Sequence, residues 1–144
     1  MGTDCCQPTV ATMILACSGG SNVGQLSNQV AIELTQEGFG KISCLAGVGA
    51  HLSGFVQSAR DIDKLMVIDG CEVGCAKGVL EHAEVPLRSY LVITDLGIDK
   101  NKDMNLKREE IDRVKEAVRR LQADAGEPAQ SGGPGTGTCG CRQT

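Results

Sequence analysis

The chain has 144 residues, which is enough for one domain of ordinary size and too few for two. Its net charge of -4 comes from interspersed acidic and basic residues, so it has no basic stripe that could follow a phosphate backbone. With no tryptophan, and with Phe39, Phe55 and Tyr90 as its only aromatic residues, it also lacks stacking platforms for bases, and we expect no nucleic-acid partner.

The N-terminal segment, residues 1–8, is predicted to be flexible and carries the pair Cys5 and Cys6. It has no basic stretch followed by an apolar core, and no apolar run in the chain approaches the ~20 residues that span a bilayer. We therefore expect a cytoplasmic protein with no membrane partner. In a reducing compartment, metal or thiol chemistry explains the eight cysteines better than structural disulfides do.

Four short apolar runs have the length and β-branched content of buried parallel strands, and each is followed by a helical pattern. The predicted strands are residues 10–16, 42–46, 65–68 and 90–94. Helical spacing of apolar residues follows at 26–34, 52–62 and 76–83, where Gly38 ends the first helix and Pro86 prevents the third from continuing.

The fourth predicted helix is the clearest, because Ile111, Val114, Val118 and Leu121 form one apolar stripe. Alternating strands and helices predict an α/β fold with three layers, α/β/α, around a four-stranded parallel sheet. We expect strand order 2-1-3-4, as in half of a Rossmann-like or flavodoxin-like fold. Residues 9–125 form the predicted single domain. Residues 126–144 form a predicted disordered Gly/Pro-rich tail with the pair Cys139 and Cys141.

Four cysteines fall near the carboxyl ends of the predicted strands, where binding sites form in parallel sheets. Cys17 closes the first strand, Cys44 lies in the later half of the second, Cys71 follows the third, and Cys75 opens the next helix. We therefore expect them to meet at one edge. Cys17 and Cys75 are also placed at helix N-termini, where the dipole favours thiolate over thiol. Four thiolates are a standard ligand set for zinc, although buried cysteines are also common core residues.

The segment Asp69-Gly70-Cys71, followed by Cys75, resembles the signature of the DGC domain family, described as zinc-binding proteins with four cysteines. The similarity runs from about Met13 to Gln122 and includes the segments 17–20 and 94–98 and Lys100. The resemblance implies that Cys17, Cys44, Cys71 and Cys75 bind one Zn²⁺ ion, for structure, sensing or metal handling. It implies no particular reaction.

Several neighbours of the cysteines have a functional and a structural interpretation. Asp69 is expected to accept N–H bonds from the following turn or to orient a ligand, and Gly70 to let the backbone pass close to the site. His51 is a candidate ligand or proton donor, or an incidental loop residue. Lys77 and Lys100 are candidates for offsetting the negative charge of a tetrathiolate site, or are ordinary surface residues.

Three alternatives stay open from the sequence. A thiol enzyme would use Cys17 or Cys71 as nucleophile and Cys75 to resolve a disulfide or persulfide. The loop of residues 17–24 suggests phosphate or nucleotide binding, although it has no G-x-G-x-x-G, no Gly-Lys-Ser/Thr and no arginine. An all-cysteine site also accepts iron or an iron–sulfur cluster in place of zinc. The cysteine pairs in the two terminal segments would deliver or scavenge metal, or would have no fixed partner.

Overall fold

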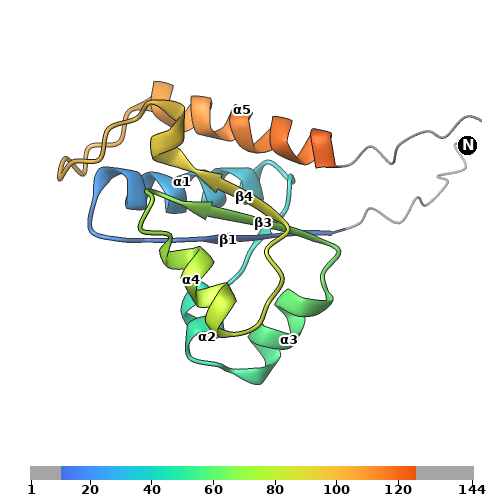
Figure 1. Ribbon diagram of the computed structural model, residues 1–144. Coiled ribbons are helices and arrows are strands. Elements are labelled where there is room, and N and C mark those ends of the chain that lie inside the picture. Colours follow the sequence, from blue (N-terminus) through green and yellow to red (C-terminus); the bar gives the residue numbers. More distant parts are fainter. Residues whose placement is uncertain (1–10, 126–144) are drawn as a thin grey trace, which may run out of the picture.

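A four-stranded parallel sheet in the order β2-β1-β3-β4 forms the centre of the computed structural model, which describes residues 11–125 (Figure 1). The predicted fold class and strand order are therefore confirmed. The strands are β1 Thr12–Ala16, β2 Lys41–Ile42, β3 Lys64–Asp69 and β4 Ser89–Val92. Strands β1 and β3 are paired along five residues and form the buried middle of the sheet.

Helices cover both faces of the sheet (Figure 1). Helices α1 and α5 lie on one face, and the shorter helices α2, α3 and α4 lie on the other. The helices are α1 Asn22–Gln36, α2 Leu45–Gly49, α3 Ser53–Asp61, α4 Cys75–His82, the 3-10 helix η1 Ile93–Leu96 and α5 Arg108–Ala125.

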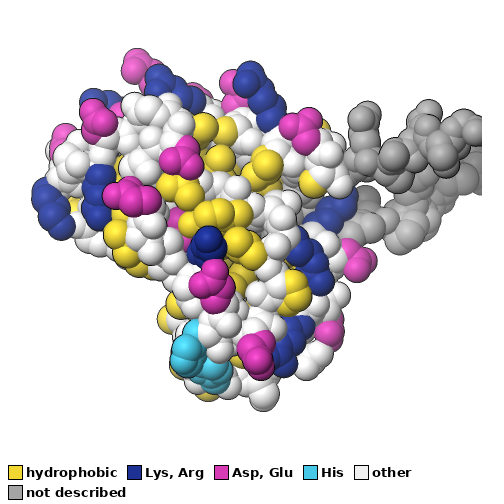
Figure 2. Space-filling model, in the orientation of Figure 1, with side chains coloured by type: hydrophobic (Ala, Val, Ile, Leu, Met, Phe, Trp, Pro, Cys, Tyr) yellow, Lys and Arg dark blue, Asp and Glu magenta, His cyan; other side chains and the backbone are white. Residues whose placement is uncertain are grey.

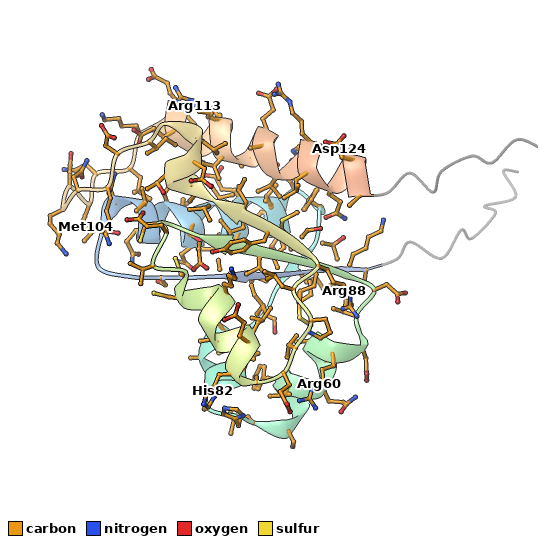
Figure 3. All side chains as sticks on the ribbon, in the orientation of Figure 1. Arg60, His82, Arg88, Met104, Arg113 and Asp124 are labelled. Carbon is orange, nitrogen blue, oxygen red and sulfur yellow. The ribbon has the colours of Figure 1, made fainter. Side chains whose placement is uncertain are left out.

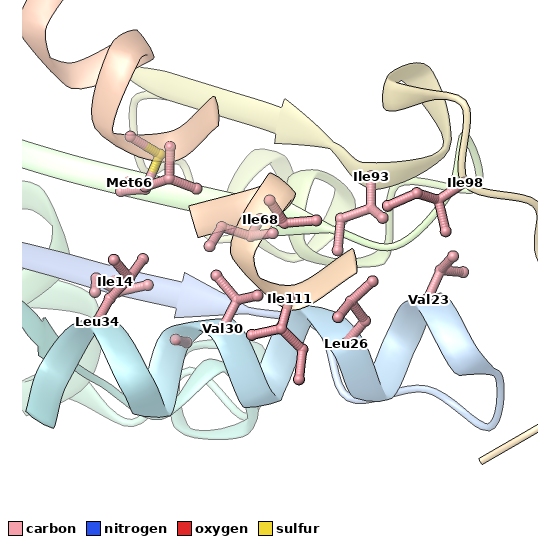
Figure 4. Close-up of a cluster of buried hydrophobic side chains, with 13 residues drawn as sticks. Ile14, Val23, Leu26, Val30, Leu34, Met66, Ile68, Ile93, Ile98 and Ile111 are labelled. Atoms are coloured by element: carbon pink, nitrogen blue, oxygen red, sulfur yellow. The ribbon is translucent and has the colours of Figure 1, made fainter. Parts of the chain in front are cut away.

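The larger of the two hydrophobic cores lies between the sheet and helices α1 and α5 (Figure 4). Leu26, Val30 and Leu34 of α1 recur every four residues, so all three point at the sheet, and each is completely buried. The predicted stripe of α5 packs into the same core through Ile111 and its neighbours. Burying each such aliphatic side chain stabilises the fold by about 1.5–3 kcal/mol.

Ion pairs join α1 to α5 outside this core. Glu33 of α1 accepts hydrogen bonds from Arg108 at 2.8 Å and from Lys115 at 3.1 Å. Arg108 contributes most to lowering the pKa of Glu33, from 4.5 to about 2, and Lys115 acts in the same direction. Glu37, the residue that caps the C-terminus of α1, pairs with Lys115 and Arg119. These contacts fix the two helices of this layer relative to each other.

The second predicted strand is longer than the observed one. Strand β2 contains only Lys41 and Ile42, and residues 45–49 form α2 in place of strand. Two contacts favour the helix. The Sγ of Cys44 caps it by accepting the N–H of Gly47 at 3.3 Å, and the ring of Phe55 packs so closely on Gly47 that an added Cβ would lie 2.7 Å from it. The fourth strand is also shorter than predicted, because η1 begins at Ile93.

The predictions for residues 1–8 and 126–144, including Cys5, Cys6, Cys139 and Cys141, concern segments outside the described residues. Within residues 11–125, no helix combines the length and the apolar character needed to cross a bilayer. The predicted domain bounds, residues 9–125, stay a prediction.

Candidate functional site

Three of the four central cysteines line one cavity at the carboxyl edge of the sheet. Cys17, Cys71 and Cys75 contribute to a cavity of about 340 Å³. The rest of its wall comes from the loop that precedes α1 together with Gly24, from Leu45, Gly70 and Val73, and from Lys100 and Lys102. The chain segments that follow β1, β3 and β4 therefore meet here, as expected for the carboxyl edge of a parallel sheet.

Cys17 is the most buried of these thiols, with 8% of its surface exposed. Its N–H donates to the carbonyl of Ile68 at 3.0 Å, and its Sγ accepts the N–H of Gly70 at 3.2 Å. Burial raises the pKa of the Cys17 thiol, although hydrogen bonds from Gly70 and Ser27 oppose this shift. The predicted helix N-terminus at Cys17 is wrong, because Ser21 caps α1 and the helix begins only at Asn22.

Asp69 holds the loop that carries Cys71 and Cys75. Its carboxylate is 1% exposed and accepts N–H bonds from Ala76 at 2.8 Å and Lys77 at 3.0 Å, as the sequence predicted. It also accepts the hydroxyl proton of Tyr90 at 2.9 Å. Burial, together with the bond to Asp69, raises the pKa of Tyr90. Because Gly74 precedes α4 without a capping side chain, Asp69 takes over the capping of this helix.

Gly70 begins the loop that carries Cys71 and Cys75, here called the cysteine loop, and lies where this loop passes the first turn of α1. An added Cβ would lie 2.7 Å from the carbonyl carbon of Val23 and 2.8 Å from the nitrogen of Gly24, so any larger residue would displace the backbone. The carbonyl of Gly70 also accepts the N–H of Thr94 at 3.2 Å. Gly70 therefore passes close to α1, and its carbonyl joins the end of β3 to η1 beside the cavity.

Cys44 lies beside the cavity, because its neighbour Leu45 belongs to the wall and Cys44 itself does not. It is exposed at the start of α2 and not within a strand, which corrects its predicted position. The thiols of Cys17, Cys44, Cys71 and Cys75 are all free. In their present rotamers, no three side chains of His, Cys, Asp or Glu among residues 11–125 are arranged to hold a metal ion.

Two lysines bring positive charge to the cavity. The Nζ of Lys100 lies 3.4 Å from the Sγ of Cys71, and the Nζ of Lys102 donates to the carbonyl of Gly20 at 2.8 Å. The sequence interpretation included Lys100 and missed Lys102, although the two lie two residues apart in one loop. Lys77 faces elsewhere: it pairs with Glu81 at 3.9 Å and lies 5.9 Å from the ring centroid of Tyr90.

His51 forms a pair with His82. The Nε2 of His51 lies 2.8 Å from the Nδ1 of His82, and the two rings meet edge to face with centroids 4.9 Å apart. Both side chains are exposed. Figure 3 shows His82 at the end of α4 that points away from the sheet. The role predicted for His51 beside the thiols stays a prediction, as does phosphate binding by the loop of residues 17–24, whose first residues line the cavity.

Comparison with known proteins gives a family and one curated relative. The sequence profile of the DGC domain matches residues 13–118. The relative is the "Anaerobic and virulence modulator AnvM" of Pseudomonas aeruginosa, which is 32% identical over 114 residues, covering 79% of this chain and 87% of that protein. No solved structure matches the chain.

Proposed function

Because the chain belongs to the DGC domain family, we propose that it is a zinc-binding protein in which four cysteine thiolates hold one Zn²⁺ ion. The proposed ligands are Cys17, Cys71 and Cys75 from the cavity wall and Cys44 from the adjoining start of α2.

One observation carries this proposal: three thiols from two different strand ends line a single cavity. Soft sulfur ligands suit zinc, and the part of the wall formed by the described residues contains no carboxylate that would favour a harder ion. Binding requires the side chains to rotate from their present rotamers and Cys44 to turn toward the cavity. Because Leu45 belongs to the wall, Cys44 is one residue away from it along the chain.

The surroundings of the thiols also suit a metal site. Cys17 and Cys44 each accept a backbone N–H, from Gly70 and Gly47, and metal-bound thiolates commonly keep such contacts. A zinc ion with four thiolates carries a charge of about -2. Lys100, which touches the sulfur of Cys71, would offset part of that charge.

We assign the site a sensing role in the cytoplasm. A reducing compartment keeps the four thiols available for metal, and oxidation of thiolates releases it, so occupancy would follow the redox state. A relative that is named as an anaerobic and virulence modulator suits such a role.

The metal content of the reduced full chain, purified without added metal, tests the proposal. Elemental analysis should find about one zinc per chain and a colourless preparation, whereas iron would give a brown or red one. The double variant Cys71→Ser/Cys75→Ser should lose the zinc. Matched controls are Cys5→Ser/Cys6→Ser and Cys139→Ser/Cys141→Ser, which should retain it. Full retention of zinc by the Cys71→Ser/Cys75→Ser variant would rule out the proposed ligand set.

Thiol exchange at Cys71 is a second candidate function, favoured by the contact between Lys100 and the sulfur. In such a reaction the thiolate of Cys71 attacks a disulfide substrate, one substrate thiol leaves, and Cys75 then displaces the second. The substrate gains two electrons and two protons, and the protein gains a Cys71–Cys75 disulfide. Lys100→Met should slow this exchange and weaken zinc binding only a few-fold, so measuring both separates the two functions.

A further inference from the structure

Strand β4 forms an open edge of the sheet. Its backbone pairs with β3 from Ser89 to Val92, and in the part of the chain that the structure describes no other segment bonds to the backbone of residues 89–92. All four residues are half-buried, whereas β3 is buried along nearly its whole length. Alternate N–H and C=O groups of an edge strand point outward, so β4 presents a template for another strand.

A groove of about 390 Å³ runs between this edge and α4. Tyr90 and Val92 form its floor on the side of the strand, and Val73, 68% exposed, forms part of its wall. At Gly78 of α4 the groove has free space, because an added Cβ at that position would meet no atom within 4 Å. Figure 2 shows hydrophobic side chains gathered in a band across the face that bears β4 and α4, with both acidic and basic side chains around it.

The groove is acidic. Its lining contains the carboxylates of Glu72, Glu81 and Asp95 against the single ammonium of Lys77, which pairs with Glu81. Within residues 11–125, neither Glu72 nor Asp95 takes part in an ion pair. A second copy paired through β4 would place a groove of the same net negative charge beside this one, and like charges repel each other. Charge complementarity therefore favours a basic occupant.

We propose that β4 binds an extended, basic peptide segment of a partner protein, which adds to the sheet as a fifth strand. The outward N–H and C=O groups of β4 pair with the peptide backbone, and alternate apolar side chains of the peptide enter the groove over Tyr90 and Val92. Its lysine or arginine side chains lie against Glu72 and Asp95. Glu72 follows the end of β3 and Asp95 follows the end of β4, both at the carboxyl edge of the sheet. A peptide held by these two acids therefore lies next to Cys71.

NMR of the ¹⁵N-labelled full chain tests this with a short synthetic peptide of alternating valine and threonine, flanked by lysines. The amide signals of residues 89–92 should shift, and their outward N–H groups should exchange more slowly with solvent. A peptide of the same core flanked by glutamates should bind about tenfold more weakly. A lysine-flanked peptide with N-methyl groups on its pairing edge should not bind, because it cannot complete the backbone ladder.

The double variant Glu72→Gln/Asp95→Asn should lose the preference for lysine over glutamate, while Glu109→Gln on the exposed side of α5 should keep it. The proposal is overturned if residues 89–92 do not respond, or if the N-methylated peptide binds equally well. It is also overturned if the signals of β4 change on dilution of the protein alone, which would identify a second copy as the occupant.

Discussion

The N–H of Gly70 donates to the Sγ of Cys17 across 3.2 Å, although the two residues are 53 positions apart in the sequence. This bond ties the end of β1 to the start of the cysteine loop, one residue before Cys71. The geometry of the two thiols is therefore coupled through one backbone group, and the coupling depends on the close passage of Gly70 along α1.

Gly70→Ala should disrupt this arrangement. The added methyl group would lie within 2.8 Å of the backbone of Val23 and Gly24, so the loop must move away from Cys17. We expect a loss of about 1–3 kcal/mol in the free energy of unfolding, measured by urea denaturation, and zinc affinity at least about tenfold lower in a chelator competition. Gly78→Ala is the matched control, because its methyl group meets open space in α4 and should leave both quantities unchanged or raise stability slightly.

Asp69→Asn should destabilise the same loop, although the asparagine side chain has nearly the same shape as that of aspartate. One carboxylate oxygen becomes an NH₂ group, so a buried N–H of Ala76 or Lys77, or the hydroxyl of Tyr90, loses its acceptor. We expect a cost of about 1–3 kcal/mol and faster hydrogen exchange at the amides of residues 76 and 77. Tyr90→Phe removes one bond only and should cost about 0.5–1.5 kcal/mol. Equal stability of Asp69→Asn and the unsubstituted chain would contradict this account.

His51→Ala tests whether this histidine is a zinc ligand or only contacts His82 at the end of α4. The observed contact joins it to His82, so we expect the zinc content to be unchanged and the cost in stability to be about 1 kcal/mol or less. If the pair acts as a unit, His51→Ala/His82→Ala should cost scarcely more than either single substitution. A zinc content that falls in His51→Ala alone would restore the predicted role as ligand.

Glu33→Gln should alter how stability depends on pH. The pKa of Glu33 is lowered from 4.5 to about 2 in the folded protein, chiefly by Arg108, so its contribution is complete above pH 4.5 and disappears as the pH falls toward 2. We expect the unsubstituted chain to lose on the order of 1 kcal/mol more than Glu33→Gln over that interval. Urea titrations of both proteins in chelator, with Glu116→Gln as an exposed control, measure the difference.

The sequence predicted the sheet well, because four apolar runs of strand length mark it and the helices between them are amphipathic. The sequence placed Cys17 and Cys71 at the carboxyl edge because a buried strand ends one residue before Cys17 and two residues before Cys71. Cys44 was misplaced because β2 is only two residues long and both are exposed, so no apolar alternation marks where it ends. The bond between Tyr90 and Asp69 joins residues 21 apart on neighbouring strands, and no local pattern reports such a pair.

The shortness of β2 also affects the energy needed to open the structure locally. The pairs Met13–Lys41 and Ile14–Ile42 join this strand to β1, with a bond from the N–H of Ser43 to the carbonyl of Ile14. Beyond this short strand, residues 43–62 are attached through the buried side chains of Val48, Val56 and Ala59 in the second core. We expect such a segment to open at a lower free energy than the core strands and to behave as its own cooperative unit in native-state hydrogen exchange. Cys44 belongs to this unit, so recruiting it as a fourth ligand would link metal capture to the ordering of the whole segment.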